Sequence, residues 1–195
     1  MARCYFKNFG KRDLFIPDYT ERFKTGIFEP FNEVELYFAQ SGELLKAVDT
    51  LRGVYHSKVV CRNFNRYLFV SRTFRVVYLF INEPEREVYN LLLTALGITD
   101  FFNFNLVRFL LSLSTVLGFS VERLDRPGWV NLMHLAPCGE EEIKSGLCTY
   151  IGPEEFLTLK RVANPSTRPY GVKEKVAKNL ERFFHRFFEF RRGQF

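Results

Sequence analysis

The chain lacks the short sequence motifs that identify common catalytic centres. It contains no glycine-rich phosphate loop, no nucleophile elbow and no paired-histidine zinc motif. Its four cysteines have none of the CxxC spacings of zinc knuckles. We therefore expect neither a cofactor nor a resident metal ion, and an enzyme is not the favoured class.

Long apolar runs are also missing. No stretch of about 18 apolar residues occurs, so no membrane span is expected. The first residues, MARCYFKNFGKRD, contain no apolar segment of the kind found in a signal peptide. Because the cysteines also form no dense framework, these absences predict a cytoplasmic protein in a reducing compartment.

The cysteines leave two interpretations open. His134, Cys138 and Cys148 are near one another in the sequence, and folding could add Cys61 to give a Cys₃His zinc site. A disulfide bond between Cys138 and Cys148 is the other interpretation. The sequence does not favour one of these over the other, and both are less favoured than cysteines buried simply as apolar side chains.

Negative charge is absent from residues 52–82. This segment has six cationic side chains and no carboxylate. Its β-branched and aromatic residues alternate as in a sheet, which predicts three strands joined at 63–65 and at 72–73. One face of this basic β-meander would be apolar and the other cationic. Like charges directly opposite each other, as Arg62 and Arg66 would be, favour an anion bound on that face.

Elements on either side of the meander complete an α+β fold. We expect a strand over 33–40, a helix over 43–52 and, after the three strands, a helix from Asn82 to Gly97. The sheet is predicted to be antiparallel, and the second half to be mostly helical. The further predicted elements are a helix over 106–117, a β-hairpin of 119–124 with 129–136, a strand over 147–151, a helix over 152–163 and a long basic C-terminal helix over 172–192.

A length of 195 residues fits one continuous domain. Within it we distinguish four segments by composition and pattern. They are an aromatic N-terminal arm (1–31), an α+β sheet lobe (32–98), a mainly helical lobe with the hairpin (99–163) and a C-terminal amphipathic helix (172–192).

Charge is segregated along the chain. The net charge is +6 over residues 50–82, −6 over 83–157 and +7 over 158–195. Either the acidic block neutralises the basic blocks within the fold, or the basic blocks face an external polyanion. A pI of about 9.2 favours the second.

We therefore expect a non-enzymatic nucleic-acid-binding protein, a role compatible with a stoichiometric place in a larger assembly. Cations from the meander and from the last helix would contact phosphate, with aromatic side chains beside them as stacking surfaces. The sequence does not separate DNA from RNA. The predicted contact residues are Lys58, Arg62, Arg66, Arg72, Arg75, Lys173, Arg182 and Arg186.

Two other functions compete with this prediction. A structural subunit would use the arm 1–31 and the phenylalanine-rich helix 172–192 to hold another protein or a second copy of itself, without nucleic acid. A small metal-independent ribonuclease would use His56 and Lys58 on the meander.

Overall fold

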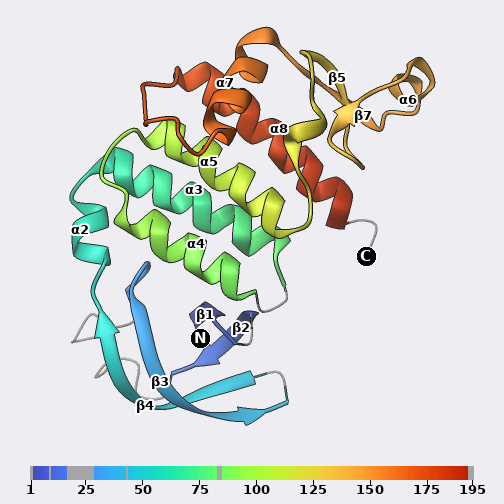
Figure 1. Cartoon of the computed structure of the whole chain (residues 1–195). Coiled ribbons are helices and arrows are strands. Elements are labelled where there is room, and N and C mark those ends of the chain that lie inside the picture. Colours follow the sequence, from blue (N-terminus) through green and yellow to red (C-terminus); the bar gives the residue numbers. More distant parts are fainter. Residues whose placement is uncertain (1, 9, 17–28, 43, 83–84, 193–195) are drawn as a thin grey trace. The chain divides into compact units, whose positions relative to one another are not determined.

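The computed structural model describes residues 2–8, 10–16, 29–42, 44–82 and 85–192. The chain divides into two compact units, Met1–Gly97 and Ile98–Phe195, which are described separately. Each unit contains helices and a sheet, so the fold is mixed α+β as predicted (Figure 1).

The sheet of the first unit has the strand order β1-β2-β4-β3. Its strands are β1 (Ala2–Phe6), β2 (Gly10–Phe15), β3 (Glu33–Ser41) and β4 (Leu44–Val54). β1 with β2 and β3 with β4 are antiparallel, whereas β2 and β4 run parallel. One face is apolar and buried, with the core residues Leu14, Ile16, Leu45 and Ala47. The sheet is therefore mixed rather than purely antiparallel.

The N-terminal strands correct the prediction of an aromatic arm. Ala2–Phe6 and Gly10–Phe15 form the antiparallel pair β1–β2, and Phe6 packs edge-on against Phe38 of β3 with ring centroids 6.2 Å apart. Most of the remaining predicted arm, 17–28, lies outside the described residues. Two parts of the predicted arm, Ala2–Phe6 and Gly10–Phe15, are therefore strands of the sheet.

The helix predicted over 43–52 is wrong, because this segment is strand β4. Along β4, Leu45 and Ala47 are buried while Lys46 and Val48 are exposed, which is the alternation of a strand with one covered face. Gly42, before the strand, has a φ of 61°, a conformation that glycine adopts without strain. The Ser-Gly pair therefore belongs to a hairpin connection, not to a helix start.

The three-stranded basic meander is also wrong. Residues 57–61 form α2 (Ser57–Cys61) and residues 64–80 form α3 (Phe64–Phe80). The buried residues Phe69, Thr73 and Val76 recur every three to four positions, as on one side of a helix. β-Branched residues favour strands only weakly, and this longer helical period outweighs them.

The start of α3 explains how the hairpin loop was misidentified. The side chain of Asn63 accepts a hydrogen bond from the backbone N–H of Arg66 (3.1 Å), which makes it the N-cap of the helix. Asparagine is frequent both in turns and at N-caps. The following helix, α4 (Arg86–Gly97), agrees with the prediction apart from its first residues, and Pro84 lies outside the described residues.

The second unit combines helices with a small sheet of order β6-β5-β7. Its helices are α5 (Phe102–Val116), α6 (Glu140–Lys144), α7 (Pro153–Ala163) and α8 (Glu174–Arg192), and its strands are β5 (Gly128–Asn131), β6 (Ala136–Pro137) and β7 (Cys148–Ile151). The predicted strand 119–124 is wrong, because Val121–Arg123 forms a 3₁₀ turn. β5 pairs instead with β6 and β7.

The phenylalanines of α8 form the core of this unit. Phe184 and Phe187 are fully buried, and Phe183 and Phe188 are at most 4% exposed. Phe187 also packs edge-on against Phe119, with ring centroids 5.1 Å apart. This stripe is therefore covered by the chain itself, which removes it from the surface that an assembly partner could use.

Arg66 stabilises the end of a neighbouring helix. Its guanidinium donates a hydrogen bond to the carbonyl oxygen of Leu96 (2.5 Å), in the last turn of α4. A cation at this position also interacts favourably with the helix dipole. Arg75, nine residues later, lies on the opposite side of α3, because each residue turns the helix by about 100°.

Substitution of Arg66 should therefore affect folding. We expect Arg66→Ala to lower the free energy of unfolding by about 1.5–3 kcal/mol, the range for a lost hydrogen bond from a charged donor. Arg75→Ala is the matched control, since Arg75 is exposed, and should change stability by less than about 0.5 kcal/mol. Chemical denaturation of both variants measures the difference. Equal stability of the two would contradict the assigned role of Arg66.

A disulfide bond closes the connection between β6 and β7. Cys138 and Cys148 are joined across ten positions of sequence, and α6 lies between them. Inside this loop, Glu142 accepts hydrogen bonds from Gly139 N–H (2.8 Å) and from the buried Asn131 side chain (2.6 Å). The bond and the carboxylate together hold the loop against β5.

Loss of this bond should destabilise the second unit. By closing a loop of this length, the disulfide lowers the entropy of the unfolded chain and so stabilises the fold by about 2.5 kcal/mol. Cys138→Ser with Cys148→Ser should therefore lower the free energy of unfolding by about that amount. Dithiothreitol should destabilise the wild type similarly and leave the double variant unaffected. Cys61→Ser is the control, because Cys61 is a free, exposed cysteine. A wild type insensitive to reductant would refute the assignment.

Candidate nucleic-acid interface

The predicted cations of residues 58–75 do not form one surface. Lys58 and Arg62 are exposed on and just after α2, and Arg75 is exposed on α3. Arg72 is half-buried, and Arg66 reaches the end of α4. The row of cations expected on one sheet face is therefore split between two helices and opposite sides of α3.

The cations of α8 do share one side of a helix. Lys175, Lys178, Arg182 and Arg186 are three or four positions apart, which is the spacing of neighbours on a helix surface. All four are exposed, on the side opposite the buried phenylalanines. Of the residues predicted from this helix, Arg182 and Arg186 belong to the row, and the sequence analysis omitted the two lysines.

Two adjoining hollows follow this row. The larger, of about 380 Å³, is lined by Tyr150, Gly152 and Arg186 among others. The smaller, of about 340 Å³, is lined by Lys175 and Lys178. Asn179 and Arg182 border both hollows. The larger hollow lies between β7, the start of α7 and the exposed side of α8, whereas the smaller hollow is lined by residues of α8 alone.

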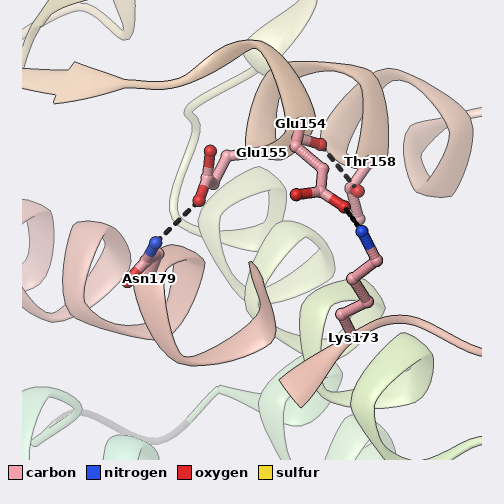
Figure 2. A network of polar contacts seen from close by, with 5 residues as sticks. All are labelled: Glu154, Glu155, Thr158, Lys173 and Asn179. Atoms are coloured by element: carbon pink, nitrogen blue, oxygen red, sulfur yellow. Dashed lines mark hydrogen bonds and ion pairs between the residues drawn. The ribbon is translucent and has the colours of Figure 1, made fainter. Parts of the chain in front are cut away.

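Hydrogen bonds attach the first turn of α7 to the beginning of α8 (Figure 2). Glu155 accepts a hydrogen bond from the side chain of Asn179 (2.7 Å), and Glu154 forms an ion pair with Lys173 (2.7 Å). Thr158 donates to the backbone carbonyl of Glu154 (2.8 Å). The contacts of Asn179 and Lys173 connect the two helices that border the larger hollow, whereas that of Thr158 lies within α7.

Lys173, a predicted phosphate contact, already has a carboxylate partner. The hydrogen bond from Lys173 to Glu154 and the charge of that carboxylate raise the lysine pKa. Both side chains are mostly exposed, so the pair is accessible to an anion but must open before Lys173 can contact one. Lys173 is therefore a weaker candidate contact than Arg182 or Arg186.

The hollows carry a net positive charge. Their linings contain four cations and two carboxylates, Glu155 and Glu174. Glu174 pairs with Lys178 at 2.6 Å. In the described part of the chain, Arg182 and Arg186 form no ion pair, and Arg186 contacts the hydroxyl of Thr149 (3.4 Å). The positive charge is therefore least compensated at these two arginines.

An aromatic pair lies beside this charge and was missed by the sequence analysis. Trp129 of β5 is directly opposite Tyr150 of β7, and their rings meet edge to face with centroids 5.7 Å apart. Trp129 is 46% exposed and Tyr150 58% exposed. The sequence signal was present, because each aromatic residue occupies the outward position of a short alternating strand.

The structure does not bring together the residues of the predicted zinc site or of the predicted ribonuclease site. The ligand atoms of Cys138, Glu142 and Cys148 lie within 4.8 Å of one another, but the two sulfur atoms are bonded together and His134 is not in this group. His56 is the half-buried N-cap of α2 rather than a strand residue facing a substrate. Neither the zinc site nor the meander arrangement of the ribonuclease is formed.

Among the described residues, no helix has the length and apolar character needed to cross a membrane.

Comparison with known proteins supplies no functional assignment. No protein-family model matches the chain, and no curated protein matches its sequence significantly.

Proposed function

We propose that the protein binds nucleic acid without catalysing a reaction, and that the contact surface is the cationic row of α8 with its two hollows. The observation that carries this proposal is the alignment of Lys175, Lys178, Arg182 and Arg186 on the exposed side of α8, beside the hollow that α8 forms with β7 and the start of α7. Binding of this kind depends mainly on cations that neutralise phosphates and release counterions.

The dimensions of the row support a linear polyanion as the ligand. Lys175 and Arg186 are separated by about 16 Å along the helix axis at 1.5 Å per residue. This length corresponds to about five phosphates along one strand of a duplex. A small anion would need only one or two of these cations, whereas a nucleic-acid backbone can contact all four.

The exposed cations of the first unit stay predicted contacts. Lys58, Arg62 and Arg75 remain accessible, and no carboxylate occurs between residues 52 and 82. Arg66 is excluded from this group by its contact with Leu96. These residues would form a separate phosphate contact in the first unit.

A structural role without nucleic acid is the second candidate. It no longer rests on the α8 phenylalanines, which are buried. The observation in its favour is the outward side of α3, where Phe64 is 74% exposed and Leu68 is 41% exposed one turn later. Exposed apolar side chains at this spacing are typical of helices that contact a partner protein.

Charge removal on α8 tests the proposal. Arg182→Ala with Arg186→Ala should weaken oligonucleotide binding about 20-fold at 0.1 M salt, because two phosphate contacts are lost. The slope of log affinity against log salt should fall by about 1.4 for single strands or 1.8 for duplex. Fluorescence anisotropy with labelled oligonucleotides measures both quantities.

Lys144→Ala with Arg161→Ala is the matched control, because it removes the same charge from exposed positions of the same unit outside the hollows. Equal losses in the two double variants would refute the α8 surface. No binding of any oligonucleotide at low salt would refute the proposed function and leave the structural role.

Glu155 provides a test in the opposite direction. Its carboxylate lies in the larger hollow and repels phosphate. Glu155→Gln keeps an oxygen that can accept the hydrogen bond from Asn179, so the helices should stay in place. We expect binding two- to fivefold tighter at low salt, about the effect of one exposed charge. Glu122→Gln, at an exposed position outside the hollows, is the control. Unchanged or weaker binding in Glu155→Gln would contradict the predicted phosphate path.

A further inference from the structure

We infer that the α8 surface is specific for single-stranded nucleic acid, because Trp129 and Tyr150 form a stacking platform for unpaired bases beside the cations. This inference rests on the proposed function and names the form of nucleic acid that the same site would select. Three features of the second unit support it, namely the orientation of the pair, its position and its exposure.

The orientation of the pair follows from the strand register. Trp129 precedes Val130, which is 1% exposed, and Tyr150 is flanked by Thr149 and Ile151, which are 6% and 2% exposed. Side chains alternate across a strand, so both aromatic rings are on the solvent side of the small sheet. Their direct opposition in the β5–β7 pairing places the rings together on that side.

The position of Tyr150 connects the platform to the charge. Tyr150 borders the larger hollow together with Arg182 and Arg186. Arg186 also donates a hydrogen bond to the hydroxyl of Thr149 (3.4 Å), whose side chain lies on the side of β7 opposite Tyr150. The shared lining of the larger hollow is therefore the observation that places Tyr150 beside the two arginines.

The exposed rings can stack on the bases of a single strand but not on those of a duplex. Bases in a duplex are stacked on one another and present only their edges, whereas unpaired bases offer whole faces to aromatic side chains. Proteins that bind single strands combine a cationic groove with such aromatic surfaces. The second unit has both features on adjoining elements.

The pair also has a simpler explanation, which the experiment must exclude. Aromatic residues opposite each other on neighbouring strands stabilise a sheet without any ligand. If that were their whole role, substitution would lower stability but would not change the preference for single strands.

Trp129 is the single tryptophan of the chain, so its fluorescence reports on the platform directly. We would titrate the full-length protein with oligothymidylate, oligouridylate, an abasic oligodeoxynucleotide and an oligothymidylate–oligoadenylate duplex. We expect strong quenching of Trp129 by one or both single strands, and little quenching by the abasic strand or the duplex. Comparison of oligothymidylate with oligouridylate separates DNA from RNA.

Anisotropy on variants provides the second readout. Tyr150→Ala and Trp129→Ala should each weaken binding of single strands about 5- to 100-fold, with the salt slope unchanged because no phosphate contact is lost. Trp129→Phe, which keeps a ring, should retain most of the affinity. Tyr37→Ala is the matched control, because Tyr37 is a strand tyrosine with 60% exposure in the other unit.

The outcomes separate the inference from the proposed function. If duplex and single strands bind equally well and Trp129 is not quenched, the inference is wrong while the proposed function stands. If the single strands bind but the abasic strand binds as tightly, the site recognises phosphate alone and the inference is again wrong. If no oligonucleotide binds, both fall. Because quenching is measured on the wild type, a variant that fails to fold does not prevent the test.

Discussion

The burial of the α8 phenylalanines is the interaction on which the second unit depends. Complete burial of each such side chain contributes about 1.5–3 kcal/mol of hydrophobic stabilisation, before the entropy cost of folding is counted. Their spacing at 183, 184, 187 and 188 fixes which side of the helix faces the core. The opposite side then carries Lys175, Lys178, Arg182 and Arg186, since a helical turn of 3.6 residues puts them there. Burial of the phenylalanines therefore determines that these four cations lie together on the exposed side of α8.

Sequence patterns predicted the second half of the chain better than the first. α5, α7, α8 and β7 have strong and mutually consistent signals, such as Gly-Pro-Glu-Glu at the start of α7, where Pro153 and two carboxylates suit the first turn. In residues 43–80 the local signals conflict. Alternating pairs such as Leu45 and Ala47 were assigned to a helix, while the β-branched residues of α3 were assigned to strands. In both segments the choice of buried side is made by tertiary packing, which composition within a short window does not contain.

Only part of the candidate site could be predicted, and the reason is the same. Arg182 and Arg186 could be found because a long amphipathic helix has a clear polar side. The contribution of β7 and β5 could not, because pairing between residues twenty-one positions apart, Trp129 and Tyr150, depends on the strand register. Arg66 shows the reverse error: as a cation in a basic segment it resembled a phosphate contact, but its hydrogen bond to Leu96 is a long-range structural contact. Charge alone does not separate these roles, whereas the partner of the charged group does.

The ion pairs described for the α8 surface lie at the beginning of the helix. Glu154, from the acidic block 83–157, pairs with Lys173 just before the helix, and Glu174, from the basic block itself, pairs with Lys178. Further along, Arg182 and Arg186 form no ion pair with any described residue, and Arg186 donates a hydrogen bond to the hydroxyl of Thr149. These two arginines border the larger hollow together with Tyr150 and Glu155. A strand attracted by charge would consequently be held most strongly at the point where its bases meet an aromatic ring, so electrostatic attraction and base stacking act at the same end of the site.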